Sequence, residues 1–305
     1  MARRKSKNKK ASLFTVILVA VLCVFSFFAE QAGIWNDALD TVSGTHTDAE
    51  GILLDAYFID VGQGDCSLFV SDGKAMLIDC GEKENADTVI QTISSLGIKK
   101  LDYAVVTHAH SDHMGAMADV INSITVDNIL VSQPCDSSAA TSTYEKFMDA
   151  ADDSGADIIL AEPDYTFTVG YAECTILAPS EVSSNENNNS IVMHISAGEN
   201  SFLLTGDAET KVEKDIMKKY PGHTADIYKA GHHGSSTSSY RKFVEQLNPE
   251  VAVIQCGKDN SYGHPNTETT DTFNELNIAY YRSDICGNIT ISCTADDYTV
   301  KTENK

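Results

Sequence analysis

The sequence Thr107-His108-Ala109-His110-Ser111-Asp112-His113 places four metal-capable side chains within six residues, in the pattern HxHxDH. It follows the apolar run 103–106, which is typical of a buried strand. The chain must turn where such a strand ends, and side chains on the turn can converge on one point. We expect the first two histidines to share one metal ion, and the aspartate and the last histidine to face another. Neutral imidazoles and a carboxylate suit zinc, and also manganese or iron.

A polar loop whose histidines simply meet solvent is the alternative for this stretch. It would require three of the nine histidines of the chain to cluster here by chance. We therefore interpret the stretch as part of a metal site and examine the rest of the chain for its partners.

The composition indicates a folded protein with an uneven distribution of charge. A chain of 305 residues with 42% hydrophobic residues can form one large domain or two ordinary ones. The formal net charge is −22, yet the first ten residues contain six lysines and arginines and no acidic residue. The rest of the chain is therefore more acidic still, which separates a basic tip (1–10) from an acidic body.

An uncharged apolar segment, residues 11–29, connects the tip to the body. As a helix it would be about 28 Å long, enough to span a bilayer. Basic residues on its N-terminal side favour a cytoplasmic tip, so we expect a single-pass membrane protein with its folded domain outside the cell. Residues 30–51 lack periodicity and are expected to form a linker, and residues 52–305 the folded domain. Cleavage of the segment as a signal peptide, which would give a secreted protein, is the alternative.

The eight cysteines do not form a disulfide framework or a CxxC pair. We expect most of them to be small buried side chains. Cys286 and Cys293 flank a Gly-Asn turn and are expected in neighbouring strands without a bond, with a disulfide across a hairpin as the alternative.

Alternating strand and helix patterns predict an α/β domain. Three strands, 54–60, 67–70 and 75–79, are separated by glycine turns and predict an antiparallel start of a sheet. Further strands are predicted at 101–107, 126–131, 157–160, 165–169, 173–177, 191–195, 202–205, 226–229, 251–255 and 278–281. Helical periodicity marks 86–96, 114–121, 143–154, 211–219 and 267–276. This order favours two sheets that face each other, with helices outside.

Metal-capable side chains recur just past the ends of four predicted strands. Besides the HxHxDH stretch, these are Asp79, Asp207 and the pair His232-His233. Strand ends of this kind gather at one rim of a layered sheet protein. His264 follows the strand that ends at Gln255 and is a fifth candidate.

Seven motifs occur in an order that resembles the metallo-β-lactamase superfamily, and within it the extracellular hydrolase domain of ComEC-type competence proteins. The motifs are FIDVGQGD (58–65), LIDCG (77–81), THAHSDH (107–113), NSIV (189–192), LTGD (204–207), KAGHHGS (229–235) and YGHP (262–265). The resemblance covers about 52–291 and implies an αββα sandwich with the metal site along one edge.

The resemblance also implies roles for individual residues. His108 and His110 would hold the first metal ion, and Asp207 would bridge both ions. The second ion would be held by Asp112, by His113 and by His233, with His232 beside it; which of the last two histidines is the ligand stays open. Asp79 would orient the stretch that carries the HxHxDH motif (residues 107–113, the metal loop) by hydrogen bonding.

The first metal site departs from the pattern of many members of the superfamily, which supply another histidine between the HxHxDH motif and the bridging aspartate. Only His194 lies in this interval, and its neighbours predict a strand residue with a structural role. Asn189 or Ser190 would then lie near a first metal ion that lacks a third histidine. We expect the second ion to be the more fully occupied.

We expect two divalent ions, zinc first and manganese as the alternative. They would produce hydroxide from a bound water and stabilise the negative charge that develops on the substrate in the transition state. Asp112, His232 and His264 are the candidate catalytic residues, with a histidine that is not a ligand neutralising the oxyanion or protonating the leaving group. The resemblance favours a phosphodiesterase or nuclease-like enzyme. The alternatives are a β-lactamase-like or other ester hydrolase, and a membrane-tethered binding module with a structural metal site.

The negative charge of the body argues against a nucleic acid as the substrate. An acidic surface repels a polyanion, and no run of lysine and arginine outside the tip could follow a phosphate backbone. Bound divalent ions would relieve the local field. DNA and a small phosphodiester therefore both remain candidate substrates.

Overall fold

Two β-sheets form the centre of the structure, a computed structural model that describes residues 51–304. The first sheet has the strand order β15 (Tyr298–Thr302), β14 (Ile289–Cys293), β1 (Leu54–Phe58), β2 (Ser67–Ser71), β3 (Lys74–Ile78), β4 (Lys100–Val106), β5 (Thr125–Val131) and β6 (Asp157–Leu160). β1, β2 and β3 are antiparallel neighbours, as predicted, whereas β3 to β6 run parallel.

The second sheet repeats this combination of antiparallel and parallel pairing. Its order is β13 (Ala279–Arg282), β12 (Val251–Ile254), β11 (Ile227–Lys229), β10 (Asn200–Leu204), β9 (Val192–Ala197), β8 (Ala172–Ala178) and β7 (Thr166–Val169). β7 to β10 are antiparallel and β10 to β13 parallel. Within each sheet, the carboxyl ends of the parallel strands therefore lie at the same edge.

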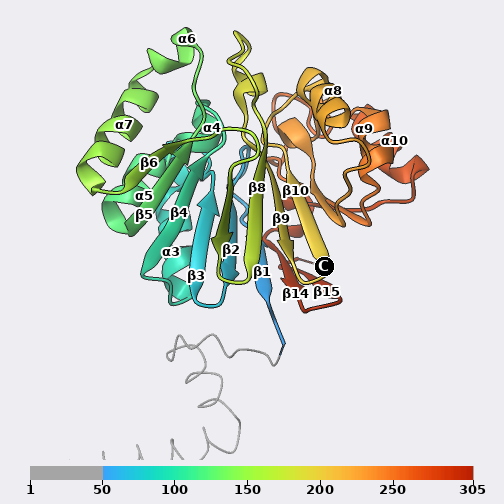
Figure 1. Cartoon of the computed structure of the whole chain (residues 1–305), viewed down its shortest axis with the longest axis horizontal. Helices are drawn as coiled ribbons and strands as arrows, with labels where there is room; N and C mark the ends of the chain where they lie inside the picture. The colour runs from blue at the N-terminus through green and yellow to red at the C-terminus, as the bar shows by residue number, and fades with distance from the viewer. Residues whose placement is uncertain (1–50, 305) are drawn as a thin grey trace, which may run out of the picture. The chain divides into compact units, whose positions relative to one another are not determined.

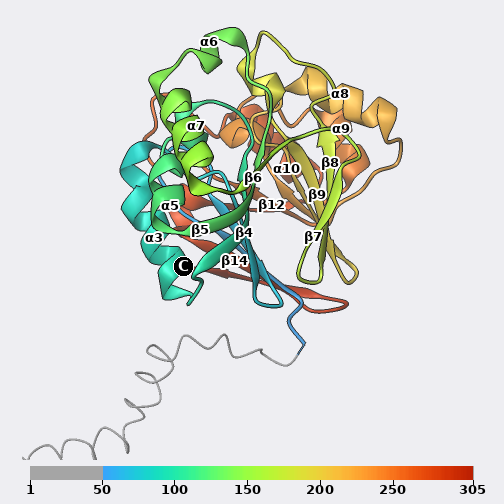
Figure 2. The same ribbon diagram turned by 60° about the vertical axis from the view of Figure 1, so that its left-hand side comes forward.

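Helices cover the outer face of each sheet. α3 (Ala86–Ser95), α5 (Met117–Ser123) and α7 (Ser142–Ser154) pack on the first sheet, and α8 (Thr210–Lys219), α9 (Arg241–Leu247) and α10 (Thr267–Glu275) on the second (Figures 1 and 2). Shorter helices lie in the connections: η1 (Lys83–Asn85), α4 (Ser111–Met114), α6 (Asp136–Ala139), η2 (Glu186–Asn189), η3 (Gly231–Gly234) and α11 (Ser283–Cys286). The sandwich predicted from the sequence is confirmed.

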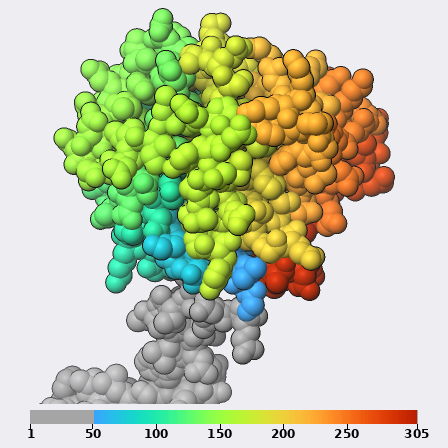
Figure 3. Space-filling model, in the orientation of Figure 1, coloured from blue at the N-terminus to red at the C-terminus, as the bar shows by residue number. Residues whose placement is uncertain are grey.

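A shared apolar core holds the two sheets together. Phe69 of β2 and Phe202 of β10 meet edge to face, with ring centroids 5.4 Å apart. Buried side chains of both sheets continue this core on either side of the pair. Because β2 and β10 lie far apart in the sequence, this contact unites the two halves of the chain, which occupy opposite sides of the space-filling view (Figure 3).

The helix predicted over 114–121 is instead two helices, α4 and α5. A side chain at Gly115 would lie 2.7 Å from the backbone nitrogen of Lys83 and 2.4 Å from the carbonyl oxygen of Ser111. The chain therefore passes close to η1 at this glycine. α4 begins at Ser111, so Asp112 and His113 lie on its first turn rather than in an open loop.

Two strands near the C-terminus, β14 and β15, were not predicted as strands in their own right. β14 pairs with β1, and β15 pairs with β14 and forms that edge of the first sheet. Cys286 ends α11 and Cys293 ends β14, so the expected pair of neighbouring strands is wrong for Cys286. All seven cysteines of residues 51–304 are free thiols, which also excludes the disulfide alternative there.

The predicted apolar anchor, residues 11–29, lies outside the described residues, as do the tip and almost all of the linker. Within residues 51–304, no helix has the length and apolar character needed to cross a membrane.

Glu213 is a buried carboxyl group on α8 and gives the fold a testable pH dependence. Its oxygens accept backbone N–H bonds from Ser239 at 2.6 Å and Tyr240 at 2.8 Å. Burial nevertheless raises its pKa from 4.5 to about 7, against the effect of these bonds. The folded state then binds more protons than the unfolded state between these two values, so stability falls as pH rises through this window.

We expect Glu213→Gln to remove this slope, because the amide keeps an acceptor for a backbone N–H and cannot ionise. Urea unfolding at pH 5, 6 and 7 should show the wild type losing about 1 kcal/mol more per pH unit than the variant. Equal slopes in the two proteins would show that Glu213 does not ionise in this range.

Candidate metal centre

The metal loop is held at both ends by one carboxylate, Asp79, which follows β3. The backbone N–H of Thr107 donates to Asp79 Oδ1 at 2.8 Å, and the Thr107 hydroxyl to Oδ2 at 2.7 Å. His113 Nδ1 lies 2.8 Å from the same Oδ2. Because β3 and β4 are parallel neighbours, Asp79 and the loop leave the sheet at the same edge. Asp79 therefore lies where the sequence predicted it, behind the loop.

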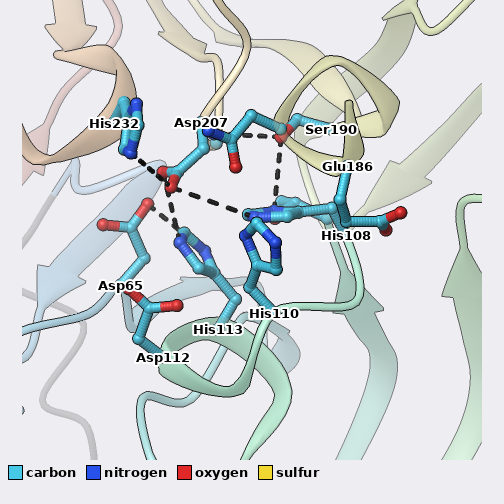
Figure 4. Close-up of polar contacts among 12 residues, drawn as sticks. Asp65, His108, His110, Asp112, His113, Glu186, Ser190, Asp207 and His232 are labelled. Carbon is cyan, nitrogen blue, oxygen red and sulfur yellow. Dashed lines mark hydrogen bonds and ion pairs between the residues drawn. The ribbon is translucent and has the colours of Figure 1, made fainter. Parts of the chain in front are cut away.

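Asp207, which follows β10, lies at the centre of the histidines (Figure 4). Its Oδ1 lies 3.2 Å from His113 Nε2, and its Oδ2 lies 3.9 Å from His108 Nε2. His232 and His233 follow β11, the strand next to β10 in the same sheet, and their Nε2 atoms lie 3.7 Å and 3.6 Å from Oδ2. The carboxylate thus faces both halves of the proposed site, as a bridging ligand must.

Two groups of potential ligand atoms share Asp207. One contains His108 and His110, whose facing nitrogens are 3.0 Å apart. The other contains His113 and His233, together with Asp65. In each group the atoms lie within 4.8 Å of one another.

The hydrogen bonding of His113 shows that the second group suits a cation. The Asp79 oxygen accepts here, so His113 Nδ1 carries a proton, and the ring, when it is neutral, presents a lone pair at Nε2. This nitrogen and Asp207 Oδ1 are both buried, and neither has a hydrogen-bond partner. Two acceptors that face each other in a buried site are repulsive unless a positive charge lies with them. A divalent metal ion satisfies this requirement.

The electrostatics of His113 support the same conclusion. Burial lowers its pKa, but the carboxylates of Asp207, Asp79 and Asp65 outweigh burial and raise the pKa well above 6.5. The surroundings therefore attract positive charge, either a proton on His113 or a metal ion beside it. Since the two compete, metal binding should weaken as the pH falls.

Asp112 is not one of the four residues of the second group, but it lies beside His233, which is. His233 Nδ1 lies 3.0 Å from the carbonyl oxygen of Gln255, so this nitrogen donates and Nε2 faces inward. Nε2 lies 3.2 Å from Asp112 Oδ2. Although burial opposes it, His113 and His233 hold the pKa of Asp112 below its ordinary value. Asp112 is therefore an anionic ligand candidate.

The geometry distinguishes the two adjacent histidines that the sequence left open. The His233 side chain is 1% exposed and is oriented by Gln255, as a ligand would be. The His232 side chain is 22% exposed, and its Nδ1 lies 3.0 Å from the Thr237 hydroxyl. Both have positive φ values, 51° and 55°, which cost energy for residues other than glycine and are common at functional sites.

Asp65 and Lys229 are site residues to which the sequence analysis assigned no role. Their side chains form an ion pair, and Lys229 is 1% exposed. Asp65 Oδ1 also lies 3.1 Å from His233 Nδ1. Because the ammonium group engages this carboxylate, we interpret Asp65 as a support behind His233, with Asp112 as the ligand in front. Both residues lie within motifs that carry the family resemblance, 58–65 and 229–235, and this is the sequence feature from which a role in the site could have been predicted.

Gly64 explains how Asp65 reaches the metal loop. A side chain there would lie 2.3 Å from the carbonyl oxygen of Asp112, and φ is +137°. The next residue, Asp65, donates its backbone N–H to that same carbonyl at 3.1 Å. The glycine therefore permits the close approach that joins the β1–β2 connection to α4.

Ser190, rather than Asn189, contacts the first group. The Ser190 hydroxyl lies 3.3 Å from His108 Nδ1 and accepts the backbone N–H of Asp207 at 3.0 Å. The Asn189 side chain instead donates to Glu186, whose other oxygen accepts the backbone N–H of Ala109 at 2.9 Å. Asn189 therefore supports the loop indirectly and does not touch the ligand candidates.

His194 belongs to neither group of potential ligands in the described part of the chain. It lies on β9, as predicted, with its ring 4.6 Å from that of His223. The first group therefore gains no third histidine from this strand.

His264 lies beyond the two adjacent histidines. Its ring centroid is 5.4 Å from that of His232 and 6.3 Å from that of His233. Its Nδ1 is buried without a hydrogen-bond partner. Burial, followed by His232 and His233, lowers its pKa to about 4, so the ring is neutral at pH 7.

Comparison with known proteins identifies a family over most of this domain. Residues 59–258 match the family described as the metallo-beta-lactamase superfamily. ComE operon protein 3 of Bacillus subtilis is 31% identical over 76% of this chain and 32% of its own length. Competence protein ComA of Neisseria gonorrhoeae is 29% identical over 75% of this chain and 30% of its own. This chain thus spans less than a third of either relative.

Solved structures show the same fold at low sequence identity. The metallo-beta-lactamase fold protein YhfI of Bacillus subtilis has a TM-score of 0.53 and 14% identity, covering 81% of this chain and 99% of that one. CmlA, a diiron β-hydroxylase from Streptomyces venezuelae, has a TM-score of 0.53 and 15% identity, covering 79% of this chain and 54% of that one. At these identities the likeness concerns the fold alone.

Proposed function

Because the chain belongs to the metallo-β-lactamase superfamily, we propose that this metallo-hydrolase is a two-metal phosphodiesterase. The observation that carries the proposal is the position of Asp207 between two groups of inward-facing histidine nitrogens. His108, His110 and Asp207 would hold the first ion. Asp112, His113, Asp207 and His233 would hold the second. Zinc is the metal that these ligands suit first, with manganese as the alternative.

When bound, two divalent ions would lower the pKa of a water molecule and stabilise the charge that develops on phosphoryl oxygens. The chain supplies fixed ligands for this chemistry. Asp79 fixes the proton of His113 on Nδ1, and the Gln255 carbonyl does the same for His233. Both Nε2 lone pairs therefore point inward, without rotation of either ring.

His232 and His264 provide polar groups on the open side of the site. His232 lies on the opposite side of Asp207 from the metal loop (Figure 4). His264 is neutral at pH 7 and would donate one N–H to a developing oxyanion. We assign oxyanion stabilisation to these two histidines, since neither has the orientation that Gln255 gives to His233.

A phosphodiester is favoured over a carboxylic ester or β-lactam for two reasons. Two-metal sites suit in-line displacement at phosphorus, because the ions contact both the attacking and the leaving oxygen. The names of the relatives, among them Recombination protein 2 of Haemophilus influenzae, point to nucleic acids. DNA is therefore a candidate substrate, together with small phosphodiesters.

We also propose the domain arrangement and location predicted from the sequence. Residues 11–29 would anchor the protein by one helix, with residues 30–51 as a linker and residues 52–305 as the catalytic domain outside the cell. Secretion after cleavage is the alternative. Accessibility of the domain to protease on intact cells, with the protein retained in the membrane fraction, would distinguish the two.

A hydrolysis panel tests the reaction. The full chain, loaded with zinc or manganese, should hydrolyse bis(p-nitrophenyl) phosphate and at least one of single-stranded DNA, RNA, a cyclic dinucleotide or a phosphocholine ester. A chromogenic cephalosporin should not be turned over. Turnover of the cephalosporin alone would favour the β-lactamase-like alternative. Hydrolysis of none of them, with Asp112→Ala losing stability, would favour a binding module.

His264→Ala should lower kcat for bis(p-nitrophenyl) phosphate about a hundredfold and leave the metal content unchanged, because the variant loses an N–H donor but no ligand. His223→Ala is the matched control, since His223 contacts His194 away from the site. Loss of metal from the His264 variant would instead show that His264 is a metal ligand. An unchanged kcat would show that His264 takes no part in the mechanism.

A further inference from the structure

Tyr262 is the most exposed large hydrophobic side chain in residues 51–304, at 67%. A single exposed aromatic residue is common on protein surfaces and needs no explanation by itself. Tyr262 differs because its ring stacks on a histidine of the candidate site. Its centroid lies 5.7 Å from that of His264, and the two planes are inclined by only 22°.

A series of rings leads from Tyr262 into the metal centre. His264 is the next ring, 6.3 Å from His233, and His233 lies 3.6 Å from the central carboxylate of Asp207. Tyr262 is therefore one ring further out than the residue assigned to the oxyanion. A flat group placed on Tyr262 would be a close neighbour of the bond that is hydrolysed.

The loop that carries Tyr262 is fixed by one asparagine. Asn260 Oδ1 accepts the backbone N–H groups of Tyr262 at 3.2 Å and His264 at 3.0 Å. Its Nδ2 donates to the carbonyl oxygens of Gly257 at 2.8 Å and His264 at 2.6 Å. The aromatic ring is thus solvent-exposed while its backbone is held in place, so little ordering is needed when a ligand binds.

We propose that Tyr262 is a stacking platform for a nucleobase attached next to the scissile phosphodiester, an inference that rests on the proposed phosphodiesterase activity. Exposed aromatic rings bind bases through their faces, without reading the sequence. Stacking does not depend on positive charge. It therefore supplies affinity that this acidic domain cannot obtain from a basic stripe along a phosphate backbone.

The test uses a substrate with a single phosphodiester bond. Thymidylyl-(3′→5′)-thymidine is compared with the same molecule in which both bases are replaced by hydrogen. For the full chain loaded with metal, Tyr262→Ala should lower kcat/KM for the complete dinucleotide roughly fivefold to a hundredfold. It should leave kcat/KM for the base-free analogue unchanged. Tyr262→Phe keeps the ring and should retain the wild-type preference.

A binding measurement provides a second readout. Calorimetry with a phosphorothioate analogue of the dinucleotide should show the same fold-loss of affinity in Tyr262→Ala. Tyr171→Ala is the matched control, because Tyr171 is also exposed and lies at the β7–β8 turn, away from the metal loop. This control should bind as the wild type does.

The outcomes separate the platform from the proposed reaction. Wild-type protein that hydrolyses bis(p-nitrophenyl) phosphate but treats the two dinucleotides alike would overturn the platform alone. Equal losses for both dinucleotides in Tyr262→Ala would also overturn it, because the ring would then act by supporting His264. Failure to hydrolyse any phosphodiester would overturn the proposed function together with the platform.

Discussion

Asp207→Asn should lower kcat/KM for phosphodiesters by about a thousandfold or more and reduce the bound metal from two ions per chain to one or none. Asp207 is the carboxylate shared by both groups of ligand atoms, so its charge acts on both ions. A loss of about 4 kcal/mol in transition-state stabilisation corresponds to a thousandfold. The amide has nearly the same shape, which keeps the change electrostatic. Metal analysis and steady-state kinetics measure the two effects.

Asp226→Asn is the matched control for this variant. Asp226 also accepts hydrogen bonds from a neighbouring strand, with Ser201 donating its backbone N–H at 2.8 Å and its hydroxyl at 2.6 Å. It belongs to neither group of potential ligands in residues 51–304. Its variant should keep both ions and most of the activity. An Asp207→Asn protein that retained two ions and wild-type kinetics would refute the bridging role.

Lys229→Met should reduce the free energy of unfolding of the metal-free protein by about 3–5 kcal/mol. Lys229 and Asp65 are both buried, and the variant would leave the Asp65 carboxylate without its ammonium partner, next to His113 and His233 only. Methionine fills nearly the same volume, so the loss reports the charge rather than a cavity. Urea unfolding is the measurement. Removing both charges, with Lys229→Met and Asp65→Asn together, should recover much of the lost stability.

Lys74→Met controls for loss of an ordinary salt bridge. Lys74 pairs with Asp102 at 2.8 Å, but its side chain is 51% exposed. Its variant should lose less than about 1 kcal/mol, because solvent screens exposed pairs. If Lys229→Met were no more destabilising than Lys74→Met, the buried pair would not be a stabilising element of the site.

The sequence predicted the sandwich and the gathering of ligand candidates because both follow from local patterns. Strand periodicity places Asp79, the metal loop and Asp207 just past strand ends, and parallel neighbours bring those ends together. The resemblance that the motif order carries then implied roles for the site residues. The sequence motifs identified which residues form the site, but not how their side chains are oriented toward one another.

The remaining features depend on contacts between distant segments. Asp65 and Lys229 are separated by most of the domain, and no local periodicity predicts their pairing. The choice between His232 and His233 required the position of the Gln255 carbonyl. The sequence left Asn189 and Ser190 open as neighbours of the first ion; the Asn189 side chain turns to Glu186, and Ser190 is the one that contacts His108. These contacts are properties of the folded chain alone.

The most direct test of the two-metal account is an anomalous difference map from crystals of the zinc-loaded protein. The account predicts two peaks about 3.5–4 Å apart, one on either side of the Asp207 carboxylate, with the stronger peak between Asp112, His113 and His233. A single peak on one side of Asp207, or peaks bound by other residues, would contradict it.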